Sequence, residues 1–456
     1  MSRAGAWVSR VFLVVLWAFA LNVEYARGEE KEPSHSYFPI PKSIRPQVDF
    51  WKKIFAVYSR YQVVIHDTET MQIYRVLDFR RLRDDEELDE ATVNQIRQDQ
   101  TKLEMAQIRS VLTKLQGCVD GLESCDNLDP EEKKIWNLFK GNTDVDRFRA
   151  AAGEDRLRTQ TGVRERFREG VQNSRRYLKA MEEIFQREGV PVELTRLPLV
   201  ESSFNLKATS KVGAAGIWQF MPSTGRLYDM QVSSAIDERR DPLIATEAAA
   251  RFLKSNYERL GAWPLAITAY NHGPGGVATA INTVGSRDIG DIVRLYRGKN
   301  FGFASRNFYT EFLAALDVER NHKKHFGALE MDAPLAYDEI SLESPLSLSR
   351  VAEFVGVESD EIRNLNPALG SPIREGSSPI PRGYQLRLPS GTYTTFQQRY
   401  SAWQDEEQAR IAAAERARQE RVEAARRAQE ERRAAWRAKR STLVRATVSK
   451  SRRRGG

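Results

Sequence analysis

The sequence predicts a mainly α-helical protein that ends in a small α+β module and a charged helical tail. A helical pattern of apolar residues runs over residues 49–322. Short β-branched segments gather over residues 336–390, and the tail beyond them consists largely of Ala, Arg, Glu and Gln, which are strong helix formers. With 456 residues, of which 41% are hydrophobic, the chain is long enough for two or three domains.

Residues 1–28 are predicted to be an export signal. Two arginines precede an unbroken apolar run over residues 11–21. At about 1.5 Å per residue this run covers roughly half of a bilayer core, which disfavours a membrane-spanning helix. The small residues Ala26 and Gly28 match a peptidase site, so we expect cleavage before Glu29 and export to the periplasm, with an envelope association left open. An uncleaved anchor and a buried helix are the alternatives.

The part before residue 323 divides into three segments. Residues 29–48 contain four prolines and are predicted to form an extended linker. Residues 49–190 are predicted to be a mostly helical region, and residues 191–322 a helical domain rich in Ala and Gly. Gly189 is expected to end one helix and Pro191 to begin the next. The clearest core-facing stripe consists of Val163, Phe167, Val171, Leu178, Met181 and Phe185.

Cys118 and Cys125 are the only cysteines, too few for a disulfide-rich scaffold or a four-cysteine zinc site. Export would allow the thiols to pair, and closing so short a loop would add about 2–3 kcal/mol. Two free buried thiols are the alternative. His272 has no partner at metal-ligand spacing, and the HGPGG segment that it begins lacks the lysine of a phosphate loop. No metal or cofactor is therefore expected.

Glu201 is the candidate catalytic residue. It follows Leu197 by four positions and Leu194 by seven, so on a helix it shares their apolar face. A carboxyl group there should be partly desolvated, which raises its pKa toward the range of a general acid that works near neutral pH. The alternative is a glutamate that caps a neighbouring helix or pairs with an arginine.

Three further segments favour the catalytic interpretation of Glu201. Residues 208–224 read ATSKVGAAGIWQFMPST, residues 269–276 read AYNHGPGG, and residues 305–316 read SRNFYTEFLAAL. They combine glycines that permit close backbone approach, an amide, a stacking phenol and an aromatic pair. In order and spacing, the set resembles the family 1 lytic transglycosylases of bacterial cell-wall metabolism over residues 190–320.

The resemblance implies a lysozyme-like helical domain that cleaves the β-1,4 bond between N-acetylmuramic acid and N-acetylglucosamine. Glu201 would protonate the glycosidic oxygen and then take the proton from the muramic C6 hydroxyl, which attacks C1 and leaves a 1,6-anhydro end. Because the nucleophile is intramolecular, a second carboxylate is dispensable, whereas ordinary glycosidases need two. Asp229, Asp237 and Asp241 match no motif, and the last two are expected to be turn and cap residues.

The same matching assigns roles to other residues of the site. Ser202 would orient Glu201 or the sugar, and Gln219 would hydrogen-bond a substituent of the glycan. Ser202 has no G-x-S-x-G motif around it, so a serine hydrolase is not expected. The glycan groove would be lined by Met221, Tyr270, Asn271 and Phe308.

The aromatic residues depart from the family pattern at two positions. Many relatives have tyrosine where Phe308 stands, which makes Tyr309 a candidate for the expected hydroxyl. Phe252 likewise stands where some members have tyrosine. Trp218 and Trp263 are expected to be core residues and not sugar platforms.

Residues 336–390 resemble a LysM domain, a small βααβ glycan-binding unit. The matching parts are residues 348–352, the Asn-Pro pair at 366–367, and the segment 383–389. The usual Gly-Asp-Thr turn after the first strand is absent. Glycan binding would keep the enzyme on its insoluble polymer by raising the effective concentration. The alternative is a structural appendage that packs on the catalytic domain.

Residues 401–456 contain the whole charge surplus of +8, with 16 Lys and Arg against 8 Asp and Glu. The rest of the chain holds 54 of each, so its body is neutral and nucleic-acid binding is not expected. One interpretation of this tail is a solvated helix with Glu–Arg pairs. The other is an arm attracted to anionic wall polymers or membrane headgroups.

The sequence thus predicts an exported peptidoglycan lytic transglycosylase whose partners are the glycan strands. A catalytically inert wall-binding scaffold with the same fold is one alternative. A hydrolytic muramidase that releases reducing ends is another.

Overall fold

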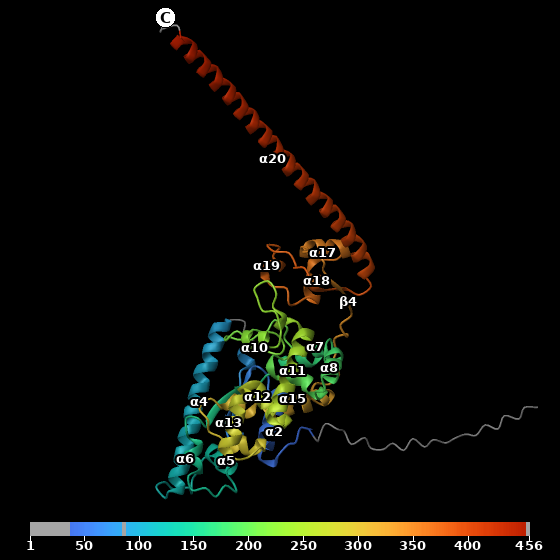
Figure 1. Ribbon diagram of the computed structural model, residues 1–456. Coiled ribbons are helices and arrows are strands. Elements are labelled where there is room, and N and C mark those ends of the chain that lie inside the picture. The colour runs from blue at the N-terminus through green and yellow to red at the C-terminus, as the bar shows by residue number, and fades with distance from the viewer. Residues whose placement is uncertain (1–36, 84–87, 453–456) are drawn as a thin grey trace, which may run out of the picture.

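The computed structural model describes residues 37–83 and 88–452 and is mainly α-helical, as predicted (Figure 1). A helical body with a small sheet is followed by an α+β module, from which one long helix projects. Within the described part of the chain, no helix combines the length and hydropathy needed to cross a bilayer. The predicted export signal, residues 1–28, lies outside the described residues.

The chain enters the body as a short 3-10 helix, η1 (Lys42–Ile44), followed by α2 (Arg45–Ala56). The predicted extended linker over residues 29–48 is therefore wrong in its last residues. Pro46 stands in the first turn of α2, where the missing N–H group has no partner to lose. Ile44 and Val48 are buried in the main core, and this burial stabilises the helical turns.

An antiparallel sheet of order β2 (Ile73–Asp78), β1 (Gln62–Asp67) and β3 (Leu157–Thr161) interrupts the N-terminal helices. The expectation of a mostly helical segment did not include it. On β1, Val64 belongs to the main core while its neighbour Val63 belongs to a second core on the other face. Because both faces are apolar, the strand lacks the polar alternation that predicts a half-buried strand.

The second core is formed by residues of the sheet and of a group of helices. Cys118, near the end of the longest of them, and Cys125 are both free thiols. Burial, and then the neighbouring Cys125 thiol, raise the pKa of Cys118 to about 11. These helices are α3 (Arg80–Arg83), α4 (Glu90–Val119), α5 (Pro130–Leu138) and α6 (Arg147–Ala151).

The main core is formed by the helices of residues 164–326 together with α2. Gly189 ends α8 in the left-handed conformation (φ 70°), and Pro191 precedes η2, as predicted. Alanines on α11 and α12 are buried in the main core, where these two helices pack against each other. The elements are α7 (Arg164–Ser174), α8 (Leu178–Glu188), η2 (Val192–Arg196), α9 (Leu197–Glu201), α10 (Pro222–Leu227), η3 (Glu238–Arg240), α11 (Pro242–Leu260), α12 (Trp263–His272), α13 (Pro274–Val284), α14 (Ile289–Leu295), α15 (Phe303–Arg320) and α16 (His322–Phe326).

The C-terminal module has the predicted βααβ order, with one additional short helix. The two strands pair antiparallel, and Phe396 and Tyr400 from the start of α20 complete the core between them and the helices. The module therefore extends beyond the predicted end at residue 390. Its elements are β4 (Tyr337–Ser341), α17 (Leu348–Val355), α18 (Ser359–Leu365), α19 (Ser371–Arg374) and β5 (Gln385–Pro389), followed by α20 (Tyr393–Arg452).

The module is docked on the helical body through residues 232–241, which we call the docking loop. Ile236 of this loop is buried in the core of the module. The Gly370 N–H group donates to a backbone carbonyl of the loop at 2.7 Å. Arg387 of β5 forms an ion pair with Asp241, and their side chains are only 7% and 2% exposed. The module thus packs on the helical body, which is the contact that the appendage alternative predicted.

Candidate active site

Glu201 is the last residue of α9 and lies in a cleft of about 580 Å³ between α9, α15, α2 and β3. The helix ends here because Ser203 and Phe204, directly after it, both have a φ of 53°, which is the left-handed region. Leu197 and Leu199 are buried and anchor α9 on the main core. The polar residues that line the cleft include Gln160, Arg166, Ser202, Asn205, Lys207, Thr209, Gln219 and Glu311.

The Glu201 carboxyl group is suited to donate a proton. Burial raises its pKa to about 8, as the apolar face of α9 predicted. The carboxyl group therefore holds its proton at neutral pH, which a general acid requires.

Glu311, on α15, is a second carboxyl group in the same cleft, and the sequence interpretation missed it. Burial, and then the charge of Glu201, raise its pKa to about 8. Two such neighbours resist simultaneous ionisation, so they titrate as a pair. The available signal was an acidic residue inside the otherwise apolar and aromatic run of residues 308–316.

The three aspartates considered as a second carboxylate do not line the cleft. Asp241 caps α11 as predicted, because its side chain accepts hydrogen bonds from the first-turn N–H groups of Leu243 and Ile244. Asp237 accepts from the Arg239 side chain at 2.8 Å. Asp229 is exposed.

Ser202 connects α9 to the loop of residues 209–220, which forms one wall of the cleft. Its hydroxyl donates to the Ile217 carbonyl at 2.9 Å. Among the hydrogen bonds of the described residues, none joins Ser202 to the Glu201 carboxyl group. In this structure Ser202 therefore holds this loop, which we call the wall loop, and lines the cleft beside Glu201.

Gln219 lies in the cleft on a strained turn of the same loop. Its φ is 51°, and its Nε2 donates to the Gly216 carbonyl at 2.8 Å. Gly216 also has positive φ (76°), and a Cβ at this position would lie 1.8 Å from the Arg239 carbonyl oxygen. Only glycine fits there. Such clustered strain is common at functional sites, where the surrounding structure maintains it.

Tyr270 and Phe308 form a layer behind the wall loop and do not line the cleft themselves. Their rings lie nearly parallel with centroids 6.4 Å apart. The Tyr270 hydroxyl donates to the Trp218 carbonyl at 2.8 Å, which holds the loop from behind. Burial, and then the charge of Glu201, raise the pKa of Tyr270 well above its ordinary value, so the phenol stays protonated near the Glu201 carboxyl group.

Two of the predicted groove residues lie apart from the cleft. Met221 is 38% exposed at the start of α10, and Asn271 accepts a hydrogen bond from the Ser305 hydroxyl at 2.9 Å. Tyr309 does not offer its hydroxyl to the cleft, because that hydroxyl donates to the Pro39 carbonyl at 2.8 Å. The Tyr309 hydroxyl therefore does not take the place of the one expected at position 308.

The remaining aromatic residues lie where the sequence predicted. Trp218 and Trp263 are buried, and the Trp218 indole donates to the Thr246 hydroxyl at 2.9 Å. Phe252 packs against Tyr270 with ring centroids 5.0 Å apart. Trp218 and Trp263 thus belong to the main core, as predicted, and Phe252 is a partly buried residue that packs against it.

Two segments of the chain match known protein families. Residues 180–293 match the transglycosylase SLT domain, and residues 336–405 match the LysM-like domain of lytic transglycosylase MltD. The second match includes the start of α20, in agreement with the contribution of that helix to the core of the module.

Individual relatives support the same resemblance. The membrane-bound lytic murein transglycosylase D of Escherichia coli (strain K12) is 32% identical over an alignment of 229 residues, and the match covers 46% of this chain and 48% of the relative. The chain thus spans about half the length of the curated relatives it matches.

Two solved structures are also similar to parts of the chain. An inactive mutant of the lytic transglycosylase Slt from Pseudomonas aeruginosa is 19% identical, with a TM-score of 0.27 over 34% of this chain and 25% of that one. The 70 kDa soluble lytic transglycosylase of Escherichia coli is 18% identical, with a TM-score of 0.26 over 53% and 47%. Both scores are too low to support a detailed structural comparison. The matched families and relatives nevertheless confirm the resemblance that the motifs predict. This chain is similar to lytic murein transglycosylases of the D type, both in the segment 180–293 and in its LysM-like module.

Proposed function

We propose that the protein is a peptidoglycan lytic transglycosylase that cleaves the bond between N-acetylmuramic acid and N-acetylglucosamine with formation of 1,6-anhydro ends. The observation that carries the proposal is the protonated Glu201 in a cleft, within the segment 180–293 that matches the transglycosylase SLT domain. Glu201 would protonate the glycosidic oxygen as the leaving sugar departs. The resulting carboxylate would then accept the proton of the muramic C6 hydroxyl as it attacks C1.

Glu311 is the observation that favours a second candidate, a hydrolytic muramidase. In hydrolysis a second carboxylate acts as a nucleophile or activates water, and both roles require the ionised form. The raised pKa of Glu311 keeps that carboxyl group largely protonated at neutral pH. This protonation state supports transglycosylation, in which one group acts first as acid and then as base.

Digestion of purified peptidoglycan sacculi tests the proposal. The mature protein should release muropeptides that are lighter by one water, and Glu201→Gln should release none. Asp229→Asn is the matched control, because Asp229 is an exposed carboxylate outside the cleft. Equal inactivity of the wild type and Glu201→Gln would favour the inert scaffold.

The proposed place of action is the periplasm, with residues 1–28 as the export signal. The support is the sequence of that segment and the similarity to a relative that is named as membrane-bound. N-terminal sequencing of the protein recovered from cells should begin at Glu29. A first residue of Met1 would contradict this assignment.

A further inference from the structure

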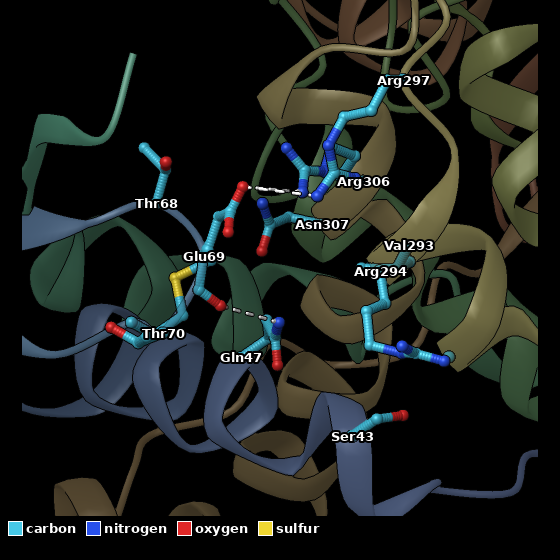
Figure 2. Close-up of a pocket in the computed structure, with 12 residues that line it drawn as sticks. Ser43, Gln47, Thr68, Glu69, Thr70, Val293, Arg294, Arg297, Arg306 and Asn307 are labelled. Atoms are coloured by element: carbon cyan, nitrogen blue, oxygen red, sulfur yellow. Dashed lines mark hydrogen bonds and ion pairs between the residues drawn. The ribbon is translucent and has the colours of Figure 1, made fainter. Parts of the chain in front are cut away.

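A pocket lined by arginines lies at the junction of the β1–β2 turn, α14 and the start of α15 (Figure 2). Its volume is about 240 Å³. Figure 2 shows Arg297 and Arg306 side by side, with their guanidinium groups directed at the carboxyl group of Glu69. Ser43 and Gln47 line the opposite side.

The positive charge in this pocket exceeds the negative charge that faces it. Glu69 Oε1 lies 3.4 Å from Arg297 Nη2 and 3.9 Å from Arg306 Nη2, while its Oε2 lies 3.5 Å from Arg156 Nη1. Arg156 is also bound to Asp67 at 2.7 Å. Arg297 and Arg306 have no other carboxylate partner among the described residues, so both keep N–H groups for a second anion.

One buried hydrogen-bond acceptor beside the pocket has no donor among the described residues. Gln47 is only 7% exposed, and its Oε1 has no partner within the described part of the chain. Its Nε2 faces the Glu69 backbone carbonyl at 3.4 Å. A ligand that carries both a carboxylate and an N–H group would satisfy the arginines and Gln47 together. A peptide has both groups, whereas inorganic phosphate provides no such amide donor.

A second pocket of about 430 Å³ extends the first toward the candidate active site. It shares Thr68, Arg306 and Asn307 with the arginine pocket. It adds the cations Arg158 and Lys299, with the exposed acids Glu154 and Asp155 also among its lining residues.

The two pockets and the catalytic cleft follow the same two elements. On α15, Phe303, Asn307 and Glu311 stand at four-residue steps on one face, and the first two line the second pocket while the third lines the cleft. On β3, Arg158 and Gln160 point to the same face, and they line the second pocket and the cleft respectively. Along α15, the residues of the second pocket therefore lie about 6 to 12 Å from Glu311.

We propose that the arginine pocket binds a carboxylate of the peptide stem carried by the glycan strand. This inference rests on the proposed function, because it assumes that the strand lies in the cleft with a stem directed along α15. Two neighbouring guanidinium groups match the planar geometry of a carboxylate, which accepts paired N–H groups. The stem would align the strand relative to Glu201 and make substrates with intact stems preferred.

The test compares cleavage of glycan strands with intact stems and of strands stripped by an amidase. The wild type should cleave intact strands about tenfold faster at limiting concentration, which corresponds to about 1.4 kcal/mol. In R297Q/R306Q the ratio of the two rates should fall toward one, and R306K should lie between. Arg259→Gln, an exposed arginine of α11 that lines none of these pockets, should keep the wild-type ratio.

The other outcomes separate failure of this inference from failure of the proposed function. A wild-type ratio in R297Q/R306Q would overturn the inference while leaving the proposed function intact. No anhydro products from either substrate with the wild type would instead overturn the proposed function. Calorimetry with the free stem peptide needs no variant: binding that inorganic phosphate does not displace supports the stem assignment. Equal affinity for phosphate would overturn it by indicating an unselective anion site.

Discussion

Glu201 and Glu311 share one cleft, and burial raises the pKa of each to about 8. These two carboxyl groups together set the pH range over which the proposed cleavage can proceed. The first step requires protonated Glu201, so activity should fall as the pH rises through its pKa. The like charge of an ionised Glu311 opposes ionisation of Glu201, and this extends the active range toward higher pH.

Replacing Glu311 by glutamine should shift the alkaline limb of the pH–rate profile to lower pH, because Glu201 loses a neighbour whose charge opposes its own. The turnover near pH 6 should fall by less than tenfold, far below the loss of about 10²–10⁴ typical of a missing general acid or base. Initial rates on sacculi over a range of pH measure both effects. A loss as large as that of Glu201→Gln would show that Glu311 is itself catalytic and favour the muramidase.

Two glycines of the wall loop provide a matched pair. Gly213 and Gly216 both have positive φ, but only a Cβ at Gly216 would meet a backbone atom, the Arg239 carbonyl oxygen. Gly213→Ala should destabilise the fold by about 1 kcal/mol through backbone strain alone. Gly216→Ala should cost about 3 kcal/mol or more and reduce kcat at least tenfold, because Gln219 and the loop must move. Urea denaturation and initial rates measure the two effects, and equal behaviour of the variants would contradict the close-approach argument.

At the scale of the elements, the docking loop joins the module to the wall of the active site. Arg239 of this loop donates to the carbonyls of Gly213 and Phe220 at 2.8 and 2.9 Å, and so supports the wall loop. Two residues later, Asp241 caps α11 and binds Arg387 of the module. The wall loop and the module are therefore bound to the same short segment.

The buried Arg387–Asp241 ion pair should be the main polar contribution to this docking. R387M should destabilise the protein by about 3 kcal/mol, because it leaves a buried carboxylate without its counter-ion. D241N/R387M should recover part of that loss, since asparagine still caps α11. Arg350→Gln breaks an exposed pair with Glu353 and should change stability by less than about 1 kcal/mol. Additive effects of D241N and R387M would show that the pair does not couple the two parts.

Over the whole molecule, the sequence correctly predicted those features that depend on short stretches of the chain. The raised pKa of Glu201, the cap at Asp241 and the helix end at Gly189 depend on a few neighbouring residues, and each is confirmed. The sheet was missed because both faces of β1 are buried. Glu311 was missed because its place beside Glu201 depends on how α15 packs against α9.

Packing of the module on the rest of the chain was one of the predicted alternatives, but its contacts could not be read from the sequence, since Arg387 and Asp241 are 146 residues apart. The placement of Met221 and Asn271 outside the cleft has the same origin, because a motif specifies residue types and not the direction of each side chain. Their predicted roles in sugar binding remain proposals. The glycan affinity of the module likewise remains a prediction.

The long helix α20 sets the overall shape, since it projects far beyond the module (Figure 1). From Ile411 to Leu443 every side chain is exposed, and 60 residues at 1.5 Å each span about 90 Å. Truncation after Gln404 keeps the residues that complete the core of the module. It should weaken retention on sacculi at low salt severalfold and leave cleavage of soluble glycan strands within about twofold of the wild type, because the tail carries the surplus positive charge. Unchanged retention in a sedimentation assay would indicate a merely solvated helix.

Digestion of sacculi in heavy-oxygen water tests the central claim most directly. Intramolecular attack by the C6 hydroxyl incorporates no solvent oxygen, so the new muramic ends should appear as anhydro products without the heavy label. Glu201→Gln should produce no new ends. New reducing muramic ends that each contain one heavy oxygen would show attack by water. That result would contradict transglycosylation and favour a muramidase that uses Glu201 and Glu311 together.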